Sequence, residues 1–138
     1  MTPDIMDAAG ERVIGLYGGF PDVTPEAQGK DYPRLLENYV AEYGEQPTSG
    51  FVANAYDAMT LLKLAIEKVA KKEDDGALVI DKAALHEALF TIQFSGMSGD
   101  ISCTKDGQCA TFKAGVYRFE NADRSTFAIG TNPKKVYP

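Results

Sequence analysis

The two cysteines of the chain, Cys103 and Cys109, flank the stretch TKDGQ near the C-terminal end. Two thiols in one short segment could bind a metal ion, exchange electrons or form a structural disulfide. A zinc site needs four ligands, whereas the one histidine, His86, lies in a predicted helix and the chain has no second Cys or His pair. A thioredoxin-like pair needs thiols separated by two residues at a helix start. The spacing therefore argues against both zinc binding and redox exchange.

A disulfide that closes a β-hairpin is the interpretation that the stretch favours, with two unpaired structural thiols as the alternative. Asp106 and Gly107 are typical of a tight turn, and residues that face each other across paired strands come within disulfide reach. The closed loop is short, so we expect it to add about 2 kcal/mol to stability. Since disulfides persist mainly in oxidising compartments, the pair predicts a periplasmic or extracellular protein.

Other groups that could do chemistry lack the partners that the chemistry needs. His86 is expected on the surface of a helix, and a cysteine–histidine hydrolase would need a free thiolate beside it. The acidic run Glu73–Asp75 follows a lysine-rich helix end, which is typical of a solvated surface. The glycines of GLYGGF lack the spacing of a phosphate-binding loop. We therefore predict a protein that is not an enzyme and holds no metal ion or cofactor. A free, reactive cysteine would restore the hydrolase alternative.

The composition predicts a globular domain that does not bind nucleic acid. Of the 138 residues, 44% are hydrophobic, which is enough for one domain with a core. The net charge of −6 leaves no clustered Lys and Arg for a phosphate backbone. No run approaches the about 20 apolar residues that cross a membrane, and MTPDIMDAAG has no signal-peptide pattern. An exported protein without a signal sequence suggests that Met1 is not the natural beginning.

The pattern of apolar and turn residues predicts helices and strands in alternation, followed by hairpins. Apolar residues that recur every three or four positions predict helices at 31–44, 51–72 and 82–92, with Asp31 and Asp81 as caps. Short runs bounded by turn residues predict strands at 13–17, 99–103, 110–120 and 125–130. In the longest helix the predicted buried face comprises Ala55, Met59, Leu62, Ala65, Ile66 and Val69. This order is typical of an α/β layer fold with an antiparallel extension.

Three segments in series resemble a known family. They are DAAGERVIGLYG, DYPRLLENYVAEYGEQPTSGFVANAYDAMTLLKLAIEKV and FSGMSGDISCTKDGQC. Their order and wording are similar to the C-terminal part of the periplasmic solute-binding proteins of branched-chain amino-acid ABC transporters, the leucine/isoleucine/valine-binding type. The resemblance spans nearly the whole chain, and it is carried by the series of segments rather than by any one motif. Most members of the family lack cysteines at the position of this pair.

The resemblance implies part of a two-lobe periplasmic-binding-protein type I fold, in which helices pack on sheet and antiparallel hairpins end the chain. In that fold two lobes joined by crossing strands close over a small ligand. Residues 1–45 are then expected in the second lobe, residues 46–100 in helices that return to the first lobe, and residues 101–138 in hinge-proximal hairpins and C-terminal strands. The chain would be a fragment of such a protein.

The resemblance also implies a function and one site residue. Phe51 matches an aromatic position that can line the ligand cleft, and the alternative is that its ring simply packs at the helix start. The implied function is capture of an amino acid or related small acid for an ABC transporter permease. An extracellular ligand-sensing domain of a signalling receptor with the same fold is the alternative. Because a fragment exposes surfaces that the whole fold buries, we also expect self-association.

Overall fold

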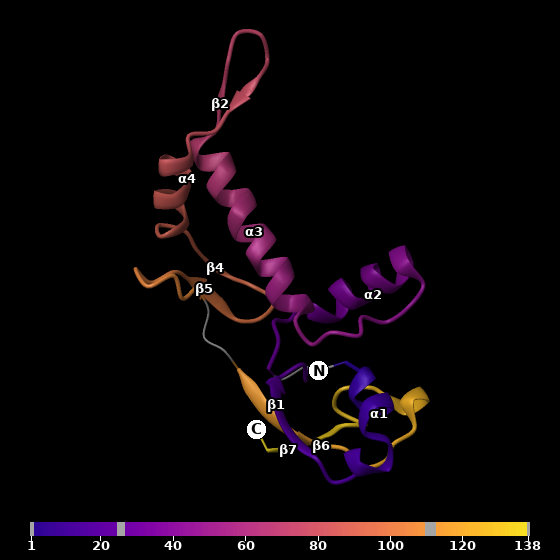
Figure 1. Cartoon of the computed structure of the whole chain (residues 1–138). Coiled ribbons are helices and arrows are strands. Elements are labelled where there is room, and N and C mark those ends of the chain that lie inside the picture. Colours follow the sequence, from indigo (N-terminus) through magenta and orange to yellow (C-terminus); the bar gives the residue numbers. More distant parts are fainter. Residues whose placement is uncertain (1, 25–26, 110–112, 138) are drawn as a thin grey trace.

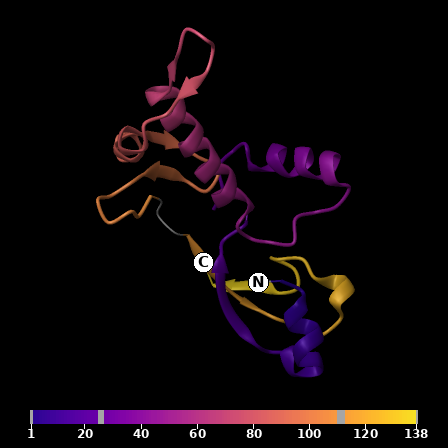
Figure 2. The ribbon, with the colours of Figure 1, turned by 45° about the horizontal axis from the view of Figure 1, so that its top comes forward.

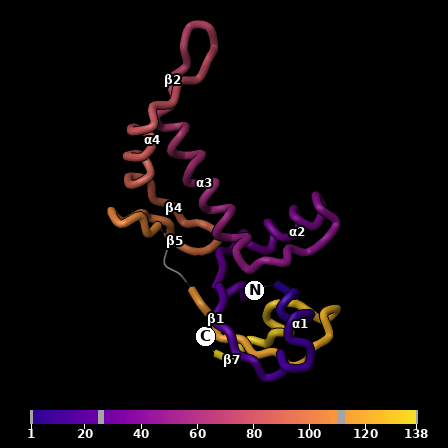
Figure 3. Tube along the Cα trace, viewed as in Figure 1, coloured from indigo at the N-terminus to yellow at the C-terminus, as the bar shows by residue number. Residues whose placement is uncertain are grey.

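The computed structural model describes residues 2–24, 27–109 and 113–137, and these form two parts (Figure 1). The sheet part consists of residues 2–21 and 114–137, and it contains both ends of the described chain. The helical part consists of residues 27–109. Residues 22–24 and Lys113, which we call the crossing, lie between the two parts. The tube view follows the same course of the chain (Figure 3).

The sheet part is built on three antiparallel strands in the order β1-β6-β7. They are β1 (Tyr17–Pro21), β6 (Ala114–Arg118) and β7 (Lys134–Tyr137). A small core of Met6, Val13 and Phe119 lies beside this sheet, and each of these side chains is at most 2% exposed. Residues from the two ends of the described chain therefore share one core.

The N-terminal segment differs from the prediction in the position of its strand. Helix α1 (Asp4–Ala9) continues into a 3-10 helix, η1 (Gly10–Val13), so Val13 is a buried helical residue. Gly15 then turns the chain at a φ of 80°, a conformation that favours glycine. The strand predicted at 13–17 therefore begins only at Tyr17, because the helical turn and the glycine occupy its first residues.

The helical part contains the predicted helices as α2 (Tyr32–Tyr43), α3 (Val52–Val69) and α4 (Lys82–Leu89). Gly44 ends α2 in the left-handed conformation, and Asp81 caps α4 by accepting a hydrogen bond from the Ala84 N–H at 2.8 Å. Asp31 occupies the N-cap position of α2, as predicted, but its side chain makes no capping hydrogen bond. Helices α3 and α4 pack against each other.

The buried face of α3 differs from the predicted one. Its buried residues are Ala53, Asp57, Leu61 and Ala65, which recur at intervals of four, and of these Ala65 alone belongs to the predicted face. Met59 from the predicted face is 65% exposed. The apolar pattern misplaced the face because Asp57, a charged residue, lies at its centre.

Two hairpins complete the helical part. Strands β2 (Lys71–Lys72) and β3 (Leu78–Val79) form a ribbon that projects beyond the end of α3 (Figure 2). Strands β4 (Gln93–Ser95) and β5 (Asp100–Ser102) form a second pair beside α3 and α4. The helices predicted to reach residues 72 and 92 thus end earlier, at Val69 and Leu89. Strand pairing takes Lys71 and Lys72, whereas a turn at Phe90 and Thr91 ends α4 before β4 begins.

The C-terminal segment also differs from the prediction. Residues 125–130 were expected as a strand, but Asp123 caps a 3-10 helix, η2 (Arg124–Thr126), and Ala128 forms only an isolated bridge. The last strand is β7 instead, where Tyr117 of β6 pairs with Lys135. The strand expected at 110–120 corresponds to β6, which covers Ala114–Arg118, and residues 110–112 lie outside the described residues.

Candidate functional site

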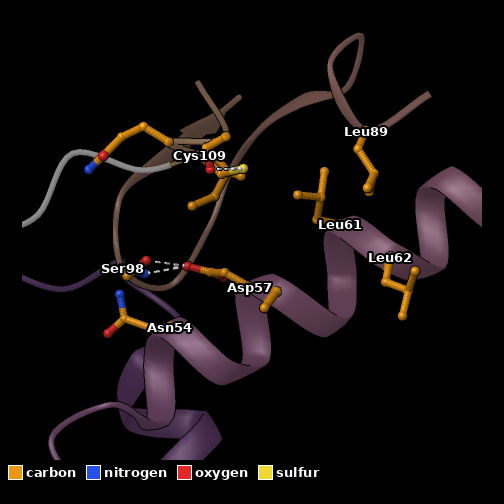
Figure 4. Close-up of a pocket in the computed structure, with 11 residues that line it drawn as sticks. Asn54, Asp57, Leu61, Leu62, Leu89, Ser98 and Cys109 are labelled. Carbon is orange, nitrogen blue, oxygen red and sulfur yellow. Dashed lines mark hydrogen bonds between the residues drawn. The ribbon is translucent and has the colours of Figure 1, made fainter. Parts of the chain in front are cut away.

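A largely apolar cavity of about 600 Å³ lies between α3, α4 and the turn that follows β5 (Figure 4). Leucine and isoleucine side chains contribute much of its apolar lining, and Asn54, Asp57, Ser98 and Gln108 supply polar groups. The apolar lining consists of Leu61, Leu62, Leu89 and Ile101. The cavity could accommodate an apolar group with a polar end.

Asp57 positions one wall of this cavity. Its carboxylate is 2% exposed and accepts hydrogen bonds from the backbone N–H of Met97 at 2.7 Å and of Ser98 at 2.7 Å, and from the Ser98 hydroxyl at 2.6 Å. A Cβ added at Gly96 would lie 2.5 Å from the Asp57 carboxylate, so only glycine fits there. Asp57 therefore ties α3 to the turn between β4 and β5.

The disulfide between Cys103 and Cys109 is confirmed, and its Cys109 lines the cavity. The turn inside it is closed by backbone bonds from Gly107 N–H to Thr104 O at 2.9 Å and from Thr104 N–H to Gln108 O at 2.8 Å. Gly107 has the expected positive φ of 84°. The disulfide thus joins the two sides of a tight turn after β5, and no described strand contains Cys109.

Phe51 lies at the start of α3, next to the place where the two parts meet. Its side chain is 49% exposed and lines none of the cavities described here. A Cβ added at the neighbouring Gly50 would lie 3.4 Å from Val23 of the crossing and 3.6 Å from Ile129 of the sheet part. A second cavity of about 370 Å³ is found at this junction, lined by Tyr32 and Leu36 of α2, residues 46–50 and residues 127–129.

The crossing contains a buried ionic cluster around Asp22. The Lys135 ammonium lies 2.6 Å from its carboxylate, and the Thr24 hydroxyl donates to it at 2.8 Å. Burial alone would raise the pKa of Asp22, but the bonds from Lys135 and Thr24 and the Lys135 charge outweigh it, so this pKa lies below its ordinary value. Burial and the Asp22 charge raise the pKa of Tyr117, which keeps its phenol protonated as a donor.

The remaining candidate groups do not form a catalytic or metal-binding arrangement in the part of the chain that the structure describes. The His86 side chain is 68% exposed and lies edge-on to Phe90, with ring centroids 5.0 Å apart. Among residues 2–24, 27–109 and 113–137, no cluster of three or more His, Cys, Asp or Glu side chains is placed to hold a metal ion. Over the same ranges, no helix is long and apolar enough to cross a membrane.

Two structural neighbours are binding proteins. The leucine binding protein LivK from Thermotoga maritima matches with a TM-score of 0.63 and 26% identity, over 88% of this chain and 32% of that one. An ABC transporter substrate-binding protein from Desulfitobacterium hafniense, solved in complex with Leu, matches with a TM-score of 0.58 and 22% identity, over 92% of this chain and 32% of that one. No protein-family model matches the chain, and no curated protein matches it significantly.

The two matches cover very different shares of this chain and of its neighbours. The chain is covered almost completely, yet it spans only 32% of the length of each neighbour. The likeness to the second neighbour shows the fold, and the first adds a likeness in sequence. The resemblance and the fold class predicted from the sequence are therefore confirmed, and the chain has the type I periplasmic-binding-protein fold of about a third of an amino-acid-binding ABC solute-binding protein.

Proposed function

We propose that the chain is part of an extracytoplasmic solute-binding protein that captures an amino acid or related small acid for an ABC transporter. The observation that carries the proposal is the match of 88% of the chain to a leucine binding protein. In such a protein the ligand stabilises a closed arrangement of two lobes and undergoes no covalent change. Delivery to a membrane permease and an oxidising compartment outside the cytoplasm follow from this role. No observation favours the sensing-domain alternative over transport.

We further propose that the sheet part and the helical part belong to the two lobes, with the ligand cleft opening between them. The disulfide-closed turn and the cavity beside α3 then lie within one lobe. The assignment of Phe51 to this cleft is supported by its neighbour Gly50, where an added Cβ would lie 3.4 Å from Val23 and 3.6 Å from Ile129. A half-exposed aromatic ring at such a junction offers an apolar surface to a ligand side chain.

Leucine is expected to perturb the chain around Phe51. Because the chain spans only 32% of its neighbours, most of the groups that would grip a ligand are absent, so binding should be weak, in the millimolar range. A nuclear magnetic resonance titration with leucine should shift the amides of residues 50–54, and Phe51→Ala should abolish the shifts.

Exposed aromatic residues of the same part provide the control for this titration. Tyr56→Ala, on the next turn of α3 and 46% exposed in the wild type, should leave the perturbation intact. Shifts centred on the α3–α4 cavity, or no shift at Phe51 at saturating leucine, would contradict the assignment of this residue to the cleft.

Self-association of the chain is expected at the free edge of β1. Ile14, Leu16 and Tyr17 are 52%, 42% and 59% exposed there, and no charged residue lies within the strand. Light scattering after gel filtration should give a mass near twice the 14.9 kDa of one chain. Tyr17→Lys should restore a monomer, whereas Tyr43→Lys, an exposed tyrosine at the end of α2, should not. A wild-type monomer would contradict this expectation.

A further inference from the structure

The first half of helix α3, which begins beside Phe51, buries little apolar surface. Over residues 52–60 the buried side chains are Ala53 and Asp57, each 2% exposed. Ala53 contributes one methyl group, whereas Tyr56 and Met59 are 46% and 65% exposed. Since apolar packing holds most helices in place, this end of α3 needs another tether, and the Asp57 carboxylate supplies it.

The tether joins Asp57 to the turn between β4 and β5. Its carboxylate accepts from the N–H of Met97 and from the N–H and hydroxyl of Ser98, and Figure 4 shows the bonds to Ser98. Hydrogen bonds to a charged acceptor are about twice as strong as neutral ones. A side chain at Gly96 would occupy the place of the carboxylate, so the helix and the turn can lie this close only with glycine there.

The same turn is bonded to the segment that precedes α2. The Gly29 N–H donates to the Met97 carbonyl at 2.6 Å, and a Cβ added at Gly29 would lie 2.7 Å from the Gly96 carbonyl oxygen. Residues 96–98 thus contact Gly29 through the backbone and Asp57 through its carboxylate. The position of α3 relative to residues 29–31 is therefore held through Asp57.

Phe51 belongs to the same helical unit as Asp57. Its carbonyl accepts from the Ala55 N–H at 2.9 Å, and its own N–H donates to the Ser49 hydroxyl at 3.2 Å. Six positions separate Phe51 from Asp57, which corresponds to about 9 Å along a helix axis. A displacement of the helix at Asp57 therefore moves Phe51 as well.

We propose that Asp57 is a positioning residue for ligand binding, because it holds the first turns of α3 on residues 96–98 and so keeps the Phe51 ring at the junction of the two parts. The inference rests on the proposed function, in which this ring contacts the ligand. Without the tether, the start of α3 samples several orientations, and a ligand must select one of them. The apparent affinity then falls with the fraction of molecules that hold the ring in place.

A label on the ring measures its position without a ligand. With 4-fluorophenylalanine incorporated at position 51, a soluble paramagnetic reagent accelerates the fluorine relaxation more strongly as the ring becomes more exposed. Asp57→Asn keeps the side-chain shape and replaces one acceptor oxygen by an amide donor. Since Phe51 is 49% exposed in the wild type, this variant should increase the acceleration about 1.5-fold or more, towards the about twofold increase of a free ring.

Two controls separate the tether from a general loss of stability. Leu61→Val, one turn further along α3, removes a buried methylene group and should destabilise the chain without changing the acceleration. Asp100→Ala removes an exposed carboxylate of the same hairpin and should also leave it unchanged. An unchanged acceleration in Asp57→Asn would overturn the proposal, and so would an equal increase in Leu61→Val.

A milder variant replaces Asp57→Asn if that protein does not fold. Ser98→Ala removes the hydroxyl bond to the Asp57 carboxylate and keeps both backbone bonds. A smaller increase of the acceleration is expected. No increase in a folded Ser98→Ala protein would then overturn the proposal.

A leucine titration relates the tether to binding. In a folded Asp57→Asn protein, the leucine concentration that half-saturates the amide shifts of residues 50–54 should rise about fivefold, while Leu61→Val keeps the wild-type value. A wild-type value in Asp57→Asn would overturn the proposal, since the position of the ring would then not matter for binding.

The fluorine measurement uses no solute, so its failure and that of the proposed function are distinguishable. A faster relaxation in Asp57→Asn with no leucine perturbation in the wild type would leave the tether in place and reject the binding role. Leucine binding by the wild type together with an unchanged relaxation in Asp57→Asn would reject the positioning role alone.

Discussion

Replacement of Asp57 by alanine should lower the free energy of unfolding by about 3 kcal/mol. The buried carboxylate accepts three hydrogen bonds, from the N–H of Met97 and from the N–H and hydroxyl of Ser98. Bonds to a charged acceptor are stronger than neutral ones, and their loss leaves two backbone donors without a partner in a region that water reaches poorly. Urea unfolding followed by circular dichroism measures the change.

Two further variants define the cause of this loss. Asp57→Asn keeps the shape of the side chain and should lose about half as much, because one oxygen remains as an acceptor. Asp100→Ala removes an exposed carboxylate that accepts from the Ser95 hydroxyl in the same hairpin, and should change stability by less than about 0.5 kcal/mol. Equal losses for Asp57→Ala and Asp100→Ala would show that Asp57 does not hold α3 to the hairpin.

Replacement of Phe119 by alanine should destabilise the sheet part by about 4 kcal/mol. Its ring is 1% exposed and packs with Met6 and Val13 in the core that joins the two ends of the described chain. Removing the ring loses its burial and leaves a cavity that the short α1 and η1 helices cannot refill without moving. Loss of near-ultraviolet dichroism and a lower urea midpoint would report this change.

An exposed aromatic residue of the same sheet is the matched control for Phe119. Tyr137 on β7 is 66% exposed, and Tyr137→Ala should cost less than about 1 kcal/mol. A Phe119→Ala protein with wild-type stability would mean that the N-terminal segment and the C-terminal strands do not share a core.

Local signals in the sequence predicted the helices and the disulfide. Gly44 and Asp81 mark helix ends through chemistry that acts within a few residues, and Asp106-Gly107 marks the turn between the two cysteines. The resemblance in three segments predicted the fold, because their order along the chain is preserved even where no single motif is diagnostic. These features depend on neighbours in sequence, which a sequence displays directly.

Features that depend on distant partners were missed. The segment around Asp22 reads as a polar loop, because Lys135, which pairs with it, lies 113 positions away. Asp57 reads as a polar residue on the surface of a helix, although the structure has it on the buried face beside Ser98. Strand β7 gave no signal of its own, since three of its four residues, Lys134, Val136 and Tyr137, are exposed and its pairing with β6 defines it.

The boundaries between lobes and the role of Phe51 remain predictions. Strand pairing and contacts in the structure group residues 2–21 with residues 114–137. The expectation that residues 1–45 belong to one lobe depends on the family resemblance alone. The two groupings differ in the placement of α2, which the resemblance assigns to the lobe of residues 1–45 and which the structure includes in the helical part. Helix α2 lies beside the start of α3 (Figures 1 and 2).

The most direct test of the central claim is leucine binding by a chimera. In it, this chain replaces the matched 32% of the Thermotoga maritima leucine binding protein, and isothermal titration calorimetry measures the affinity. A part of a solute-binding protein should complete the two-lobe fold, so a folded chimera should bind leucine, and Phe51→Ala in the chimera should weaken binding by about tenfold or more. A folded chimera that does not bind leucine, or whose affinity is unaffected by Phe51→Ala, would contradict the account.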